Sequence, residues 1–356
     1  MASARAASSA CSSKSSSFSR RHPVGPAWPR ARCIIAVGGG KGGVGKSVVA
    51  ANLAVAMAQM GKRTLVFDAD LGAANLHTMF GIDRPGPGLQ GFIARVVDSL
   101  DEAVVATNVP DLYLVPGSAG IPGCANIMHS QKQRVLRALY RLDYDVVVID
   151  VGAGVAYNAL DFFDAADLRL VVMAPQLTSI QNAYAFLKSA VFRVILQLGQ
   201  DRDAKAKIAK AQQIGGPTAP VSALVDALRQ TAPDLVPRVE AELTHFGCRI
   251  VGNYVFQDAE MASLMNIGRL IRDYLRVHAP LIGALRAQRS IHDSVNRRVP
   301  LLLSDASSRN ARELKRIARM LASENVARLR ELRAGAPEPP PERQATGPIE
   351  VVDALV

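Results

Sequence analysis

The sequence predicts an α/β protein built on a doubly wound, mostly parallel β-sheet. Short runs rich in Val, Ile and Leu alternate along the chain with longer segments of helical periodicity, as in sheets that carry helices on both faces. One of these runs, the Val-Val-Val-Ile of 146–149, holds no polar residue, which is typical of a strand buried on both faces. A glycine-rich turn joins the first strand-like run to the first helical segment.

Length and composition agree with a folded chain. The 356 residues are 49% hydrophobic and 21% charged, as in ordinary globular proteins. At about 150 residues per domain the length allows two domains, but one large α/β domain is equally compatible. No apolar run approaches the roughly 18 residues of a membrane span. The cysteines Cys11, Cys33, Cys124 and Cys248 form no C-x-x-C pair, which argues against a disulfide scaffold, a zinc ribbon and a cluster held by paired cysteines.

The expected elements follow from β-branched runs, helical periodicity and turn residues. Strands are expected at 33–37, 64–67, 111–115, 145–149, 168–173 and 249–255, and helices at 47–60, 132–142, 180–198 and 310–322. Gly61 is expected to end the first helix as a C-terminal cap. Residues 199–247 are expected to form a helical insertion. Because ligands of doubly wound sheets bind at the carboxyl ends of the strands, the functional residues are expected there.

The two ends of the chain differ in composition from this central part. Residues 1–32 hold six basic and no acidic residues, which predicts a disordered basic arm; an organellar transit peptide is the alternative. Residues 33–322 are expected to form the folded domain, 323–334 a helical extension that could contact a membrane, and 335–356 a Pro-rich disordered tail. The range 269–334 carries fifteen basic and six acidic residues, so it could face an anionic membrane or DNA.

A phosphate-binding loop is predicted between the first strand and the first helix. Residues 40–47 read Gly-Lys-Gly-Gly-Val-Gly-Lys-Ser, which fits the pattern G-x-x-x-x-G-K-[ST]. Its glycines let backbone N–H groups converge on phosphate oxygens at the positive end of the helix dipole. Lys46 is expected to reach the β- and γ-phosphates and Ser47 to ligate Mg²⁺. The expected nucleotide contacts are Gly40, Lys41, Gly42, Gly43, Val44, Gly45, Lys46, Ser47 and Val48. The central domain is therefore predicted to be a P-loop NTPase domain.

The string Lys-Gly-Gly-Val-Gly-Lys-Ser that starts at Lys41 resembles the deviant Walker A motif of the MinD/ParA family of ATPases. The resemblance implies ATP as the nucleotide and an ATP-dependent homodimer in which Lys41 reaches the nucleotide of the partner subunit. A finger group of this kind contributes about 10³–10⁵ in rate. Residues 175–184, Pro-Gln-Leu-Thr-Ser-Ile-Gln-Asn-Ala-Tyr, and 297–302, Arg-Arg-Val-Pro-Leu-Leu, look like segments of the flagellar-number (FlhG/FleN-like) branch of that family.

The same resemblance implies roles for polar side chains that follow the strands. Residues 68–75 read Asp-Ala-Asp-Leu-Gly-Ala-Ala-Asn and are similar to the family's switch I segment. By that match Asp70 positions the attacking water, Asp68 supports the Mg²⁺ shell, and Asn75 stabilises the loop around the phosphates. Asp150 looks like the Walker B aspartate, which holds Mg²⁺ through water. Asn253 matches the asparagine that contacts adenine.

The resemblance implies an Mg²⁺-dependent ATPase that acts as a spatial switch for flagellar number or placement, the division site or another cargo. The alternative is an ATP-binding regulator or scaffold of a transcription factor or other partner, with little turnover. A ParA-type DNA partition ATPase and a metal-cluster carrier are weaker alternatives. The protein partner could be a flagellar GTPase or a division or transcription regulator. A cytoplasmic protein is expected, free or peripheral at the inner face of the cell membrane, with membrane and DNA both open as its contact surface.

Overall fold

The computed structural model describes residues 33–117, 127–199, 202–215, 219–324 and 326. The predicted basic arm 1–32, the tail 335–356, most of the extension 323–334, and the cysteines Cys11 and Cys124 lie outside the described residues. Among the helices within these ranges, none is long and apolar enough to cross a membrane.

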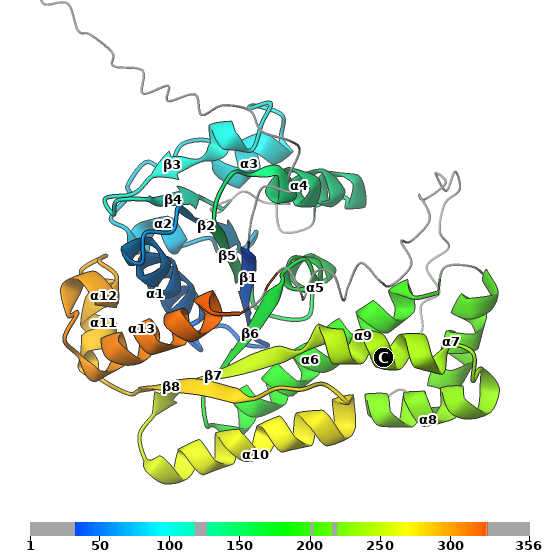
Figure 1. The fold of residues 1–356 in the computed structure, drawn as a ribbon. Helices are drawn as coiled ribbons and strands as arrows, with labels where there is room; N and C mark the ends of the chain where they lie inside the picture. The colour runs from blue at the N-terminus through cyan, green and yellow to red at the C-terminus, as the bar shows by residue number, and fades with distance from the viewer. Residues whose placement is uncertain (1–32, 118–126, 200–201, 216–218, 325, 327–356) are drawn as a thin grey trace, which may run out of the picture.

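The described strands form one sheet in the order β3-β4-β2-β5-β1-β6-β7-β8 (Figure 1). Their bounds are β1 Cys33–Gly38, β2 Thr64–Ala69, β3 Val105–Ala106, β4 Leu112–Val115, β5 Val146–Val151, β6 Leu168–Met173, β7 Cys248–Val255 and β8 Leu281–Arg286. All neighbours pair in parallel except β3 and β4. The central strand β1 has β5 on one side and β6 on the other. The predicted doubly wound, mostly parallel sheet is confirmed.

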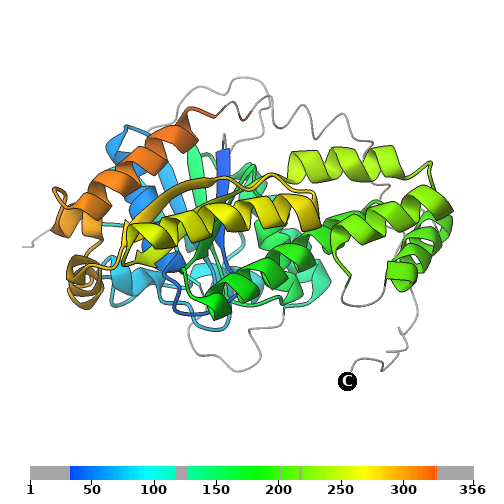
Figure 2. The same cartoon turned by 90° about the horizontal axis from the view of Figure 1, so that it is seen from below.

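Helices cover both faces of the sheet (Figures 1 and 2). They are α1 Lys46–Gln59, α2 Leu76–Met79, α3 Gly88–Ile93, α4 His129–Arg141, α5 Tyr157–Asp164, α6 Leu177–Gln197, α7 Arg202–Gly215, α8 Val221–Thr231, α9 Val236–Phe246, α10 Asp258–Leu275, α11 Arg289–Asn296, α12 Leu301–Ser304 and α13 Arg309–Ala322. A short 3₁₀ helix spans Asp101–Ala103. One core cluster unites the sheet with α1 and α11–α13, and the other unites it with α3–α10.

The expected strands and helices are present, with ends that differ by a few residues. The strands β3 and β8 and the helices α2, α3, α5, α10, α11 and α12 were not predicted from the sequence. The strand β8 reads Leu-Ile-Gly-Ala-Leu-Arg, and a central glycine weakens the strand pattern. In 199–247 the described chain forms α7, α8 and α9, which lie together to one side of the sheet in both views (Figures 1 and 2).

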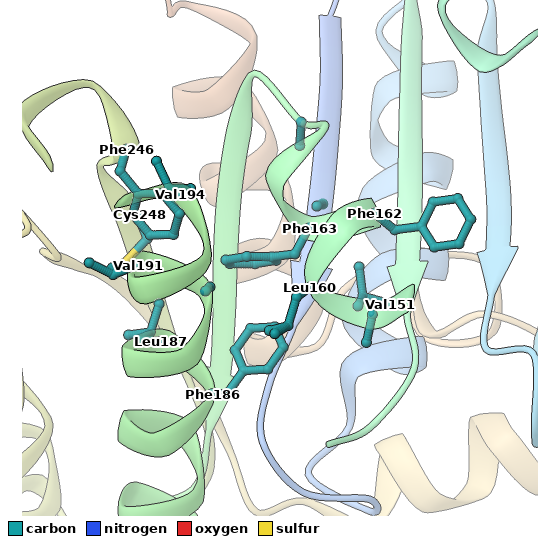
Figure 3. Packing of buried hydrophobic residues seen from close by; sticks show 14 of the residues in the cluster. Val151, Leu160, Phe162, Phe163, Phe186, Leu187, Val191, Val194, Phe246 and Cys248 are labelled. Atoms are coloured by element: carbon teal, nitrogen blue, oxygen red, sulfur yellow. The ribbon is translucent and has the colours of Figure 1, made fainter. Parts of the chain in front are cut away.

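Aromatic packing fixes the end of the central strand. Phe163 and Phe186 pack edge to face, with ring centroids 4.8 Å apart and planes at 71° (Figure 3). Both rings are fully buried. A Cβ on Gly38, the last residue of β1, would lie 2.8 Å from the Phe163 ring. Because buried side chains are close-packed, only glycine fits there without moving the rings. The packing therefore fixes the point at which the chain leaves β1 and turns toward α1.

Side chains of α13 close the free edge of β8. Asn310 donates from Nδ2 to the carbonyl oxygen of Arg286 at 2.9 Å and accepts at Oδ1 from the Arg286 N–H at 2.8 Å. Glu313 accepts a backbone N–H of the same strand, and Arg316 donates to one of its carbonyls. The three side chains are spaced three residues apart and therefore lie along one face of the helix. They take the place of a further strand, which blunts the edge against pairing with other chains.

The other face of α13 packs on the P-loop helix. Leu314, Ile317, Ala318 and Leu321 are buried in the cluster that contains α1, and α13 is in contact with α1. The helix expected at 310–322 therefore packs on the domain, as the sequence suggests. Its apolar stripe is covered by the protein and is not available to a bilayer.

Candidate active site

The phosphate loop connects β1 to α1 at the carboxyl edge of the sheet. Two of its glycines stand where no side chain fits. A Cβ on Gly40 would lie 1.8 Å from the backbone oxygen of Asn182 in α6, and a Cβ on Gly45 would lie 2.2 Å from Nδ2 of Asn253. Gly45 also has a φ of 91°, in the region that glycine adopts most readily. The loop is therefore held between α6 and the end of β7.

Lys46 lies at the first position of α1 and is buried. Its Nζ donates to the carbonyl oxygen of Lys41 at 3.1 Å. Burial lowers the pKa of Lys46, and the carboxylates of Asp150 and Asp70 oppose that shift. The ammonium is thus positioned inside the loop and near two acidic groups. The Lys41 side chain is exposed and borders a pocket of about 230 Å³.

Two buried carboxyls lie side by side at the ends of β2 and β5. Asp68 and Asp150 are partners in the sheet register, and both are nearly inaccessible to solvent. Burial, reinforced by their mutual repulsion for Asp150, raises the pKa of Asp68 to about 7 and that of Asp150 to about 8. The Ser47 hydroxyl hydrogen-bonds the Asp150 carboxyl. The Oδ1 atom of Asp150 is buried and has no hydrogen-bond partner among the described residues.

Asp68 also organises the loop that follows β2. Its Oδ1 accepts the N–H of Asp70 at 3.1 Å, and its Oδ2 accepts the N–H of Leu76, also at 3.1 Å. The backbone of Gly117, at the end of β4, donates to the same carboxyl. Since backbone donors already occupy both oxygens, the observed contacts of Asp68 are those of a residue that positions the loop.

Asp70 and Asn75 lie in that loop. Oδ1 of Asp70 accepts the N–H groups of Gly72 and Ala73 at 3.2 and 3.0 Å, and a Cβ built on Gly152, after β5, would be 3.3 Å from the same carboxyl. The Asn75 side chain is exposed and donates to the carbonyl oxygen of Ala73 at 3.0 Å. Both residues therefore stabilise the loop on the side that faces the segment after Asp150.

Asn253 lies at the end of β7 and is buried. Its Nδ2 donates to the carbonyl oxygen of Val44 at 2.8 Å, while its Oδ1 is buried without a described partner. The pairing of β7 with β8 shifts register between Gly252 and Val255, and Tyr254 has a φ of 56°. A bulge of this kind re-aims the side chains next to it, and here the Asn253 amide lies against the phosphate loop.

The structure thus brings most of the predicted residues to one edge of the sheet. Three residues that were not among the predicted site residues, Tyr254, Gln176 and Ser179, line the 230 Å³ pocket together with residues 41–44 and Ala174. The unusual φ of Tyr254 carries no signal in the sequence. In the described part of the chain, no three His, Cys, Asp or Glu side chains are grouped to hold a metal ion alone. A cation here would also need the Ser47 hydroxyl and phosphate oxygens as ligands.

Comparisons with known proteins agree with this geometry. A family model described as "AAA domain" matches residues 32–198. The antiactivator FleN of Pseudomonas aeruginosa is 35% identical over 157 residues, which are 44% of this chain and 55% of that protein. The flagellum site-determining protein YlxH of Helicobacter pylori is 35% identical over 44% of this chain and 52% of its own length. The match therefore spans about half the length of these relatives. The septum site-determining protein MinD of Helicobacter pylori is 26% identical over 82% of this chain and 91% of its own.

Solved structures share the fold. MinD of Pyrococcus horikoshii OT3, solved as a complex with Mg-ADP, superposes with a TM-score of 0.55 at 20% identity over 82% of this chain and 96% of that one. A ParA family ATPase of Chlorobium tepidum TLS gives 0.54 at 16% identity over 81% and 98%. Likeness at this identity shows the fold. In that fold, and in the motifs of the phosphate loop and the strand ends, the chain is similar to the MinD/ParA family of P-loop ATPases.

Proposed function

We propose that this protein hydrolyses ATP with Mg²⁺, forms a homodimer when ATP is bound, and uses that cycle as a spatial switch. The observation that carries the proposal is the placement of Lys46, Ser47, Asp70 and Asp150 around one phosphate loop. Phosphoryl transfer needs positioning and charge stabilisation more than covalent help. A lysine, a hydroxyl and carboxylates beside a phosphate cradle meet that need.

The residues present fit Mg²⁺. Asp150 has a buried oxygen without a partner, and its carboxyl bonds the Ser47 hydroxyl. Mg²⁺ keeps several waters and takes one or two carboxylates with substrate phosphates, so a full cage of protein ligands is not required. Ser47 and Asp150 would hold the ion, with Asp68 beside them. When bound, Mg²⁺ neutralises charge on the phosphate oxygens. It would also remove the reason for two adjacent buried carboxyls to stay protonated.

Asp70 is the residue proposed to orient the attacking water. One of its oxygens holds the loop through two backbone N–H groups, which fixes the direction of the carboxylate. The second oxygen, Oδ2, has no hydrogen bond to the described residues and can accept one from a water. Lys41 is proposed to act on the nucleotide of a partner subunit, since its side chain is exposed while its backbone carbonyl accepts a hydrogen bond from the Lys46 ammonium.

The buried amide of Asn253 supports adenine as the base. One N–H of Nδ2 is donated to Val44, and Oδ1 is buried without a partner among the described residues, so this oxygen can accept a hydrogen bond from a ligand. An oxygen accepts hydrogen bonds, and adenine offers an exocyclic amino group at the position where guanine has a carbonyl. The amide would therefore both support the loop and favour ATP over GTP.

Exposed apolar side chains at the same edge support a dimer. Val155 after β5, Leu177 after β6 and Phe256 after β7 are 50%, 69% and 68% exposed. Apolar residues clustered around a polar site are typical of a surface that another protein covers. A second copy of this chain, seated on this edge, would cover them and bring each Lys41 toward the other subunit's nucleotide.

The role proposed for the cycle is positional. Its relatives carry the names antiactivator, flagellum site-determining and septum site-determining protein. We infer a cytoplasmic switch that sets flagellar number or placement or the division site, with peripheral membrane attachment in one nucleotide state. Its partner would be a flagellar GTPase or a division or transcription regulator.

Steady-state phosphate release tests the proposal. The full chain should release phosphate from ATP only with Mg²⁺, and Asp70→Ala should lose more than about 100-fold in kcat while it still binds a fluorescent ATP analogue. Asp273→Ala, an exposed aspartate of α10, is the matched control. Light scattering should show a dimer with ATP and a monomer with ADP. An unchanged rate in Asp70→Ala would overturn the ATPase assignment. Tight ATP binding and dimerisation with no turnover in the unmodified chain would instead favour the regulator or scaffold.

A further inference from the structure

A second pocket lies on the outer side of β8, between α10 and α13. It has a volume of about 310 Å³ and is separate in its lining from the pocket beside the phosphate loop. Its lining residues are Met261, Ala284, Arg286, Arg309, Arg312, Glu313 and Arg316. The closure of the β8 edge by α13 forms this pocket, because the helix bonds the strand only through side chains and stands off from it.

The lining is strongly cationic. Four guanidinium groups and one carboxylate surround the pocket. Glu313 is engaged by Arg316, and the outer acid Asp258 is engaged by Arg286. The Asp258 side chain is 89% exposed, so a competing anion could displace it from Arg286 at little cost. Arg309 contributes to lowering the pKa of both Asp258 and Glu313, as expected of a positive charge close to each.

Two of the arginines remain available. Arg309 and Arg312 are exposed on the first turns of α13, and no carboxylate of the described residues lies within ion-pair distance of either. Arg312 donates to the carbonyl oxygen of Ser307 at 2.6 Å through one nitrogen, which steadies the side chain and leaves its other donors. Since arginine stays charged at every physiological pH, this cluster holds a permanent surplus of positive charge at a concave surface.

We propose that this arginine pocket binds a phosphate group, carried by a small ion or by a lipid headgroup. Guanidinium groups bind phosphate oxygens in pairs of parallel hydrogen bonds, and several of them here converge on one hollow. The concave shape suits one compact anionic group, whereas a double helix needs contacts spread along a groove or ridge. Since the apolar face of α13 is buried in the domain, these arginines are the part of the helix that can contact an anionic partner.

Pyrophosphate binding to the full chain tests the pocket. ADP and Mg²⁺ in excess fill the phosphate loop, so that calorimetry reports only a second site. Arg309→Gln combined with Arg312→Gln should weaken pyrophosphate binding at least tenfold, since hydrogen bonds to charged groups contribute about a factor of ten or more each. The control is Lys315→Gln combined with Arg319→Gln, which removes the same charge from α13 outside the pocket and should change the affinity less than about twofold. Arg286 and Arg316 stay intact because they also bond neighbouring residues.

Vesicles of phosphatidylglycerol and duplex DNA separate the sources of the phosphate. Loss of vesicle binding in the Arg309/Arg312 variant but not in the control assigns the pocket to a lipid headgroup. Unchanged vesicle binding with lost pyrophosphate binding assigns it to a small phosphate ion. Equal loss in both variants, for pyrophosphate, vesicles or DNA, means that an extended basic surface attracts anions without a pocket and overturns the proposal. Absence of any pyrophosphate binding to the ADP-filled chain also overturns it.

Discussion

Replacing Asn310 by Ala is expected to destabilise the fold by about 2–6 kcal/mol. Asn310 is completely buried, and its amide satisfies both the N–H and the carbonyl of Arg286 at 2.8 and 2.9 Å. Ala removes both bonds and leaves two backbone groups of the β8 edge without a partner. Each buried group orphaned in this way costs about 1–3 kcal/mol. Entry of water would bring the result toward the low end of the range.

Urea unfolding of the full chain without nucleotide measures this effect. The midpoint should fall while the slope of the unfolding free energy with urea stays constant, because the unfolded surface is unchanged. Asn296→Ala, at an exposed position of α11, is the matched control and should stay within about 0.5 kcal/mol of the unmodified chain. A loss of less than about 1 kcal/mol for Asn310→Ala, or one equal to the control, would refute the conclusion that this side chain closes the sheet edge.

Three further predictions concern the site. Burial raises the pKa of Asp150 to about 8, so between about pH 4 and pH 8 the folded chain keeps a proton that the unfolded chain releases, and stability without Mg²⁺ falls as pH rises. Asp150→Asn should unfold at a higher temperature than the unmodified chain at pH 8 in EDTA and show a shallower pH dependence; an identical dependence would contradict this. Gly40→Ala would place a Cβ 1.8 Å from the Asn182 carbonyl and should weaken binding of a fluorescent ATP analogue at least tenfold; unchanged binding would contradict the close packing of the loop against α6. Lys41→Ala should lower kcat by about 10³ with little change in ATP affinity at monomer concentrations, and a full rate in this variant would exclude action of Lys41 in hydrolysis.

Local sequence determined much of this protein. The glycines and lysines of 40–47 predict the phosphate loop because the phosphate contacts expected of that loop come from its own backbone and from side chains within a few residues. The apolar run before Asp150 predicts a buried strand for the same local reason. The alternation of such runs with helices was enough to give the doubly wound sheet, since connections in these folds are short and of one hand.

Contacts between distant residues were decided only by the tertiary structure. Asn253 and Val44 are 209 residues apart, and only the strand order β1-β6-β7 in the sheet brings that amide to the loop. The protonation of Asp68 and Asp150 depends on shared burial at paired register positions, which no spacing in the sequence records.

The C-terminal part shows the same division. The helical periodicity of apolar residues in 310–322 predicted a helix that packs on the domain, and the structure has α13 there. The sequence did not predict β8, and without that strand the polar side chains of α13 have no evident role. Their closure of the β8 edge, and the arginine pocket that results, depend on how far the helix stands from the strand. Sequence patterns of one element specify its own conformation and its buried face, but a site formed between two elements depends on their relative positions, which only packing of the whole core sets.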